Sequence, residues 1–139
     1  EVARDVAGIA AADHAEYGRE GGDLLIHELL CSLVGQRLEV RLADPMIQVL
    51  YGCNWAEERY YCRFGLNPAY LPALEAAGLR PAGWDVADDQ PRIMRLDDHP
   101  FFVVTLFVPQ TSSTPDVAHP LIVGFLRSAA GMEPGERPA

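Results

Sequence analysis

The chain has 139 residues, 49% of them hydrophobic and 22% charged, a composition typical of one globular domain rather than a disordered segment. All 11 basic residues are arginine and they are outnumbered by 20 acidic residues, so the net charge of −9 argues against a nucleic-acid-binding surface. No apolar run approaches the roughly 20 residues of a membrane helix, so we expect no membrane association.

The first half of the chain predicts a helix, a loop and strands. Residues 1–10 have helical periodicity, and because this helix starts without a lead-in we expect it to continue a segment that precedes residue 1. Residues 11–23 are predicted as a polar loop, punctuated by Gly21 and Gly22. Residues 24–35 fit either a helix or a buried strand. Residues 37–42 alternate apolar and charged side chains, which predicts a half-buried strand.

The second half alternates predicted helices and strands. Residues 45–52 predict a helix with Pro45 in its first turn and Gly52 near its end. Residues 57–68 are strand-like, and 68–78 form an amphipathic helix that ends at Gly78. Residues 79–86, 91–98 and 101–108 predict three short strands. A last helix spans 119–130 with Leu121, Phe125 and Ala129 on one face, before a flexible tail at 131–139. The pattern indicates an α/β protein.

The cysteines and other potential ligands predict neither a metal site nor a cofactor. Cys31, Cys53 and Cys62 are odd in number and lack CxxC or zinc-type spacing, which indicates free thiols in a reducing, cytoplasmic compartment. No grouping of His, Cys, Asp and Glu has metal-ligand spacing, and no glycine-rich phosphate loop is present. The sequence carries no oligomerisation motif, and a homo-oligomer stays open.

Four segments, in order along the chain, carry a family resemblance. The segment from His99 to Ala130 contains His-Pro-Phe-Phe-Val, a strand, Phe-Val-Pro-Gln, a Ser/Thr-Pro loop and His-Pro-Leu before the last helix. It resembles the closing segment of the glutamine amidotransferase domain of CTP synthase. The segments at 1–16, 58–67 and 75–83 are similar to that domain's Glu-Tyr-Ala-Arg helix, its Glu-Arg-His-Arg-His-Arg segment and a helix-to-strand step.

The resemblance implies a fold and a further segment that carries the nucleophile. The implied fold is the class I glutamine amidotransferase-like, flavodoxin-like three-layer α/β fold, with residues 1–130 as its C-terminal portion. In that family the helix opening at Glu1 follows the nucleophile elbow, a Gly-x-Cys-x-Gly turn. We therefore expect the nucleophilic cysteine to lie upstream of residue 1 or in a partner chain.

The resemblance also implies a lost catalytic pair. Class I amidotransferases hydrolyse glutamine with a Cys-His-Glu triad, whose His and Glu come from a Phe-His-Pro-Glu segment. Here Val108 and Gln110 occupy those positions. Valine cannot accept a proton, and glutamine has no charge to stabilise an imidazolium. We therefore predict that the chain does not carry out ordinary glutamine hydrolysis.

The family's substrate-holding positions are kept. Glu16 falls where the family glutamate holds the α-ammonium of glutamine, and Arg63 falls where an arginine holds the α-carboxylate. Phe64 replaces the neighbouring tyrosine, so that the ring is retained without its hydroxyl. The implied ligand is a glutamine-like amino acid. The alternative is that Glu16 and Arg63 are ordinary loop and strand charges.

Cys62 replaces the histidine that precedes this arginine in the family. A thiol beside Arg59 and Arg63 is expected to be reactive, which makes Cys62 a candidate catalytic residue; the alternative is a small buried hydrophobe. Cys31 and Cys53 are expected in the core. His99 and His119, each before a proline, are expected to be structural, whereas His14 could line the pocket.

Three functions stay open from the sequence. The first is a divergent amidotransferase-like enzyme that binds a glutamine-like amino acid and uses a cysteine for chemistry other than ordinary glutamine hydrolysis. The second is a catalytically inactive pseudoenzyme that acts as a binding or regulatory module. The third is a chain that completes a scaffold for a partner.

Overall fold

A computed structural model of the chain describes residues 1–17 and 23–134. Gly21 and Gly22, predicted as loop punctuation, lie outside the described residues, as do the last five residues of the predicted tail.

The larger sheet has five antiparallel strands in the order β4-β3-β6-β7-β8. They are β3 (Arg37–Leu42), β4 (Trp55–Arg59), β6 (Leu79–Asp85), β7 (Pro91–Leu96) and β8 (Val103–Thr105). The alternation predicted for 37–42 is confirmed, because Val40 and Leu42 are buried while Arg37, Glu39 and Arg41 are exposed. β8 is shorter than the predicted strand at 101–108.

The smaller sheet has three strands in the order β1-β2-β5. They are β1 (Ala12–His14), β2 (Asp23–Glu28) and β5 (Phe64–Leu66), with β1 parallel and β5 antiparallel to β2. The prediction of a polar loop at 11–23 is therefore wrong for 12–14. Three residues are too short to show the two-residue period by which a strand is recognised, so only the pairing with β2 reveals this one.

The helices are short and their ends follow from their sequences. They are α1 (Val2–Asp5), α2 (Pro45–Tyr51), α3 (Leu71–Ala76) and α4 (Pro120–Ala129), with 3-10 turns η1 (Ala15–Tyr17), η2 (Pro68–Tyr70) and η3 (Pro109–Ser112). The side chain of Asp44 caps α2 by accepting the Ile47 N–H. Pro45 lies in the first turn and Gly52 ends the helix in the left-handed conformation, and both positions are as predicted. α1 is shorter than predicted, and Gly8 beyond it has a φ of 69° that no helix continues through.

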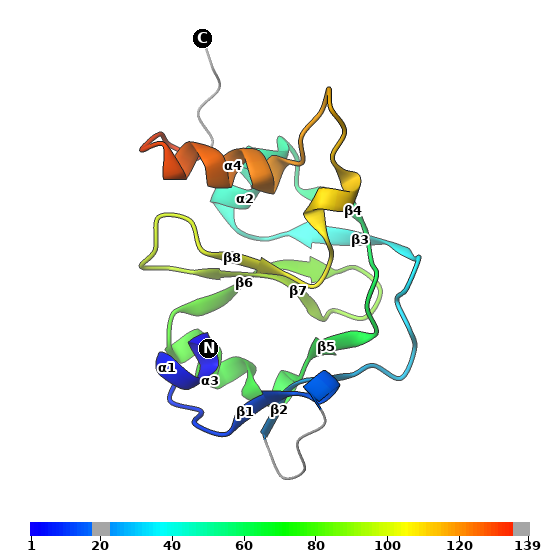
Figure 1. Cartoon of the computed structure of the whole chain (residues 1–139), viewed down its shortest axis with the longest axis vertical. Coiled ribbons are helices and arrows are strands. Elements are labelled where there is room, and N and C mark those ends of the chain that lie inside the picture. The colour runs from blue at the N-terminus through cyan, green and yellow to red at the C-terminus, as the bar shows by residue number, and fades with distance from the viewer. Residues whose placement is uncertain (18–22, 135–139) are drawn as a thin grey trace.

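The elements form three layers, which Figure 1 shows edge-on. α2 and α4 lie side by side on one face of the five-stranded sheet, and the three-stranded sheet with α1 and α3 lies on the other. Each interface has its own apolar core. The first is built around Val40, Ile47, Ile93 and Leu121, and the second around Ala3, Leu66, Leu74, Leu79 and Met94.

The packing of α4 differs from its predicted face. Leu121 is buried, but Phe125 and Ala129 are exposed, and Gly124 takes the second buried position. A Cβ on Gly124 would lie 2.8 Å from side-chain atoms of Leu50 and Phe101, so the missing side chain allows α4 to approach α2 closely. Among residues 1–17 and 23–134 no helix is long and apolar enough to cross a membrane.

Candidate functional site

A cavity of about 1000 Å³ lies where the two sheets face each other. Five of the six predicted site residues line it: Glu16, Cys62, Arg63, Phe64 and Val108. Glu16 comes from η1, Cys62 and Arg63 from the segment before β5, Phe64 from β5 itself, and Val108 from the segment after β8. The sixth, Gln110, lines a separate cavity of about 370 Å³ together with Leu121 and Phe125. The two residues at the triad positions therefore border different cavities.

The connection from β4 to β5 brings Cys62 and Arg63 to the cavity. The strand-like run at 57–68 is not one strand, because β4 ends in the larger sheet and β5 begins in the smaller one. Tyr60, fully buried, anchors the break: its N–H donates to the Gln36 carbonyl, and its carbonyl accepts the Gly35 N–H. The next three residues cross between the sheets, and the Arg63 carbonyl accepts the Leu29 N–H at 2.7 Å.

Charged and aromatic groups gather at the mouth of the cavity. Arg63 Nε lies 3.1 Å from Oε1 of Glu28, and both side chains are more than half exposed. The Arg63 guanidinium carbon lies 5.9 Å from the centre of the Phe64 ring. The His14 ring packs against Phe64 at 4.9 Å, and its Nδ1 accepts the Glu16 N–H. His14 thus lines the cavity, whereas Glu28 is a neighbour that the sequence did not predict.

The Cys62 thiol sits half-buried against main-chain carbonyls. Its Sγ lies 3.4 Å from the Leu106 oxygen and 3.6 Å from the Phe64 oxygen, so the S–H is shared between two acceptors. All three cysteines are free, as predicted. The expected core positions of Cys31 and Cys53 are wrong, because both are exposed: each lies in an irregular connection rather than in a strand or helix.

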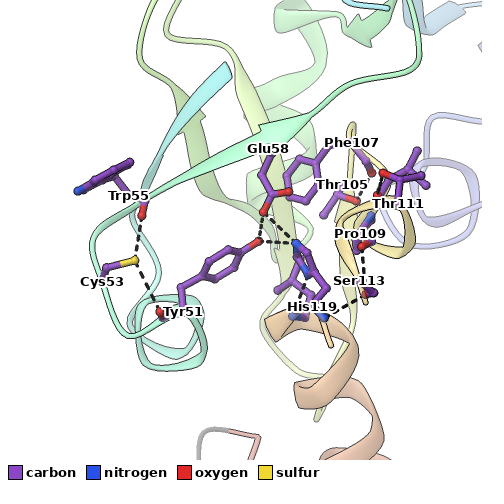
Figure 2. Close-up of polar contacts among 12 residues, drawn as sticks. Tyr51, Cys53, Trp55, Glu58, Thr105, Phe107, Pro109, Thr111, Ser113 and His119 are labelled. Carbon is purple, nitrogen blue, oxygen red and sulfur yellow. Dashed lines mark hydrogen bonds and ion pairs between the residues drawn. The ribbon is translucent and has the colours of Figure 1, made fainter. Parts of the chain in front are cut away.

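A buried polar cluster ties α4 to the larger sheet, as Figure 2 shows. His119 Nε2 lies 2.9 Å from Glu58 Oε1, and the Tyr51 hydroxyl donates to the same oxygen at 2.6 Å. His119 Nδ1 accepts the Leu121 N–H, so the imidazole proton is on Nε2 and is donated to Glu58. Burial, then the neighbouring Glu58 carboxyl group, raises the pKa of Tyr51. The cluster is closed to the large cavity, and His119 is structural, as predicted.

A second buried cluster does reach the large cavity. Arg92, which lines it, is paired with Asp85 and Asp88. This cluster could not be predicted from the sequence, because an Arg in a short strand next to an acidic turn usually lies at the surface. In the described part of the chain, no group of three or more His, Cys, Asp or Glu side chains is arranged to hold a metal ion.

Comparison with known proteins identifies the fold. No protein-family model matches the chain. Among solved structures, the glutaminase domain of CTPS from Trypanosoma brucei, determined with bound acivicin, superimposes with a TM-score of 0.84 at 22% sequence identity. The match covers 95% of this chain and 55% of that one, so the chain spans about half the length of the protein it resembles. The chain therefore has the α/β fold of the class I glutamine amidotransferases, in the form found in the glutaminase domain of CTP synthase.

Proposed function

We propose that the large cavity binds a glutamine-like amino acid by its headgroup. In this proposal Glu16 accepts the α-ammonium group, Arg63 holds the α-carboxylate, and Phe64 forms the wall beside it. The observation that carries the proposal is that Glu16, distant in sequence, lines one cavity together with Cys62, Arg63 and Phe64. Convergence of polar and aromatic side chains in one concave site is typical of a ligand pocket, whereas ordinary surface charges are not expected to converge in this way.

The contact between Arg63 and Glu28 is compatible with this role. Glu28 engages Nε of the guanidinium. The planar fork of an arginine carries further N–H donors on its two terminal nitrogens, which can take a carboxylate side-on. Glu28 would then orient the guanidinium while the ligand occupies the terminal nitrogens.

The chemistry we propose is cysteine-based and differs from ordinary glutamine hydrolysis, with Cys62 as the candidate catalytic residue. Val108 borders the cavity and brings no proton acceptor to it. The second candidate function is a pseudoenzyme that binds the amino acid without turnover. It is favoured by the setting of the Cys62 thiol, whose hydrogen-bond partners among the described residues are two main-chain carbonyl oxygens.

Substitution of Arg63 tests the binding proposal. Because a hydrogen bond to a charged group contributes about 1.5–3 kcal/mol, Arg63→Ala is expected to weaken glutamine binding about ten- to a hundredfold, measured by calorimetry on the full-length protein. Arg80→Ala is the matched control, since Arg80 is also exposed and paired with a single carboxylate, that of Asp97, away from the cavity. Equal affinities of the two variants would rule out the headgroup role of Arg63.

A further inference from the structure

A polar cavity of about 270 Å³, which we call the edge cavity, lies at one margin of the larger sheet. Two strands and one 3-10 turn form it: β3, the edge strand β4, and η3, which packs against β4 (Figure 1). Every residue that lines it is polar: Arg37, Glu57, Glu58, Arg59, Thr111 and Ser112. None of these six lines the large cavity, so the edge cavity is separate from the proposed amino-acid site.

Two arginines of the edge cavity stand directly opposite each other. Arg37 on β3 and Arg59 on β4 are partners in the antiparallel register, so their side chains project from the same face of the sheet. Like charges in this position are destabilising unless a counter-charge neutralises them. Glu57 neutralises Arg37, because its Oε1 lies 2.8 Å from Arg37 Nη1. Within residues 1–17 and 23–134 no carboxylate forms an ion pair with Arg59, so the charge of Arg59 is left uncompensated there.

The carboxylate of Glu58 does not supply the missing counter-charge. Adjacent side chains of a strand point to opposite faces of the sheet, so Glu58 and Arg59 diverge. The Glu58 side chain is 3% exposed, and its Oε1 accepts hydrogen bonds from Tyr51 and His119 under α4. Glu58 therefore borders the edge cavity while its charge is engaged in the buried cluster.

The surroundings of Tyr61 show that this edge of the sheet favours negative charge on oxygen. Arg59 Nη1 donates to the Tyr61 hydroxyl at 3.2 Å. This hydrogen bond lowers the pKa of Tyr61, and the charge of Arg37 acts in the same direction. The exposed Ser112 on η3 brings a hydroxyl group to the same cavity. Donors from β3, β4 and η3 thus converge on one concave site.

We propose that the edge cavity binds a phosphate group, held by the guanidinium groups of Arg59 and Arg37 and by the hydroxyl of Ser112. The planar fork of a guanidinium matches two phosphate oxygens at once. Because the donors come from three elements, they approach from different directions, which suits a tetrahedral oxyanion better than a planar carboxylate. The phosphate is either free or carried by a small metabolite as a monoester, for which about 270 Å³ leaves room.

The test titrates inorganic phosphate into the full-length protein by calorimetry at pH 8, with sodium chloride at the same ionic strength as the blank. Arg59→Gln is expected to weaken binding about tenfold, because it removes a charge-assisted hydrogen-bond donor. Arg127→Gln is the matched control and is expected to change nothing. Arg127 on α4 is also half-buried, also has no ion pair within residues 1–17 and 23–134, and does not line the edge cavity.

A second variant tests the charge balance in the opposite direction. Glu57→Gln removes the carboxylate that neutralises Arg37, so it is expected to tighten phosphate binding about threefold. A gain in affinity cannot result from a damaged fold. Titration with glycerol phosphate then distinguishes the two sources of the phosphate group. Tighter binding of the monoester identifies a phosphorylated metabolite, and equal or weaker binding identifies inorganic phosphate; both results support the site.

The Tyr61 hydroxyl reports where the phosphate binds. A bound anion beside Arg59 disfavours the phenolate, so saturating phosphate is expected to raise the pKa of Tyr61 in a spectrophotometric titration. Binding that leaves the Tyr61 titration unchanged would place the phosphate elsewhere and overturn the proposal. Equal affinities of Arg59→Gln and Arg127→Gln, or no binding by the unmodified protein, would overturn it as well. Because the two cavities share no lining residue, none of these outcomes affects the proposed amino-acid site.

Discussion

At the scale of single residues, the reactivity of a side chain depends on the groups that it contacts in the fold. Cys62 is the clearest example. Its position in the sequence, between Arg59 and Arg63, predicts an activated thiol. In the structure the Arg59 guanidinium donates to the Tyr61 hydroxyl and Arg63 pairs with Glu28, while the thiol contacts carbonyl oxygens. The two arginines nearest to Cys62 in the sequence therefore interact with Tyr61 and Glu28.

Alkylation of Cys62 distinguishes the enzyme from the pseudoenzyme. If the thiol is inactive, iodoacetamide is expected to label Cys62 more slowly in the folded protein than in the denatured chain, because it is half-buried and its proton is shared with two carbonyls. The exposed Cys31 serves as the internal control and is expected to react at close to its denatured-state rate, whereas Cys53, although exposed, also lies against two carbonyl oxygens. Mass spectrometry of the labelled peptides gives the three rates. Faster labelling of folded Cys62 would support the cysteine-based enzyme instead.

At the scale of elements, the side chain of the N-cap residue His119 fixes α4 to the larger sheet. His119 both caps α4, through Nδ1 and the Leu121 N–H, and bonds to the buried Glu58 on β4. The residues are 61 positions apart, so this one imidazole joins the last helix to the edge strand of the larger sheet. His99, the other histidine before a proline, lies at an exposed turn, and its hydrogen-bond partner among the described residues is the Phe101 N–H.

This difference predicts unequal costs for two similar substitutions. His119→Ala removes a helix cap and leaves the buried Glu58 carboxyl group short of a donor, so we expect a loss of about 2–4 kcal/mol in the free energy of unfolding. His99→Ala removes one bond at the surface and is expected to cost about 1 kcal/mol or less. Urea denaturation measures both values. Equally small losses would show that the Glu58 contact contributes nothing to stability.

At the scale of the whole molecule, the tyrosines report on the packing of the layers. Of the five tyrosines, Tyr51 and Tyr60 lie in or against the core between the helices and the larger sheet. Burial raises the pKa of both well above the ordinary value of 10.0, although the Arg92 charge partly opposes this at Tyr60. At the exposed Tyr61, the hydrogen bond from Arg59 lowers the pKa instead.

A spectrophotometric titration should therefore resolve two populations. Tyr61 is expected to ionise first, while Tyr51 and Tyr60 stay neutral until the chain unfolds. Because unfolded tyrosines lose their protons near pH 10.0 and these two retain them in the fold, stability is fully present below that pH and is lost as the pH rises above it. Absorbance of the phenolates, with circular dichroism as the measure of folding, follows both events. Tyr61→Phe should reduce the early phase by one tyrosine and leave the late phase unchanged, and complete ionisation before any loss of structure would contradict the assignment.

The sequence by itself determined several of the local elements and, through four ordered motifs, the fold. The alternation in β3, the capping residues of α2 and the glycine after α3 act through neighbouring residues, so they can be read along the chain. Tertiary structure alone decided which groups meet. Periodicity shows which face of a strand is buried but not which strand pairs with it, and so β4 and β5 could be predicted as one strand although they join different sheets. For the same reason only the fold brings Glu28 to Arg63 and separates Gln110 from the cavity that Val108 lines.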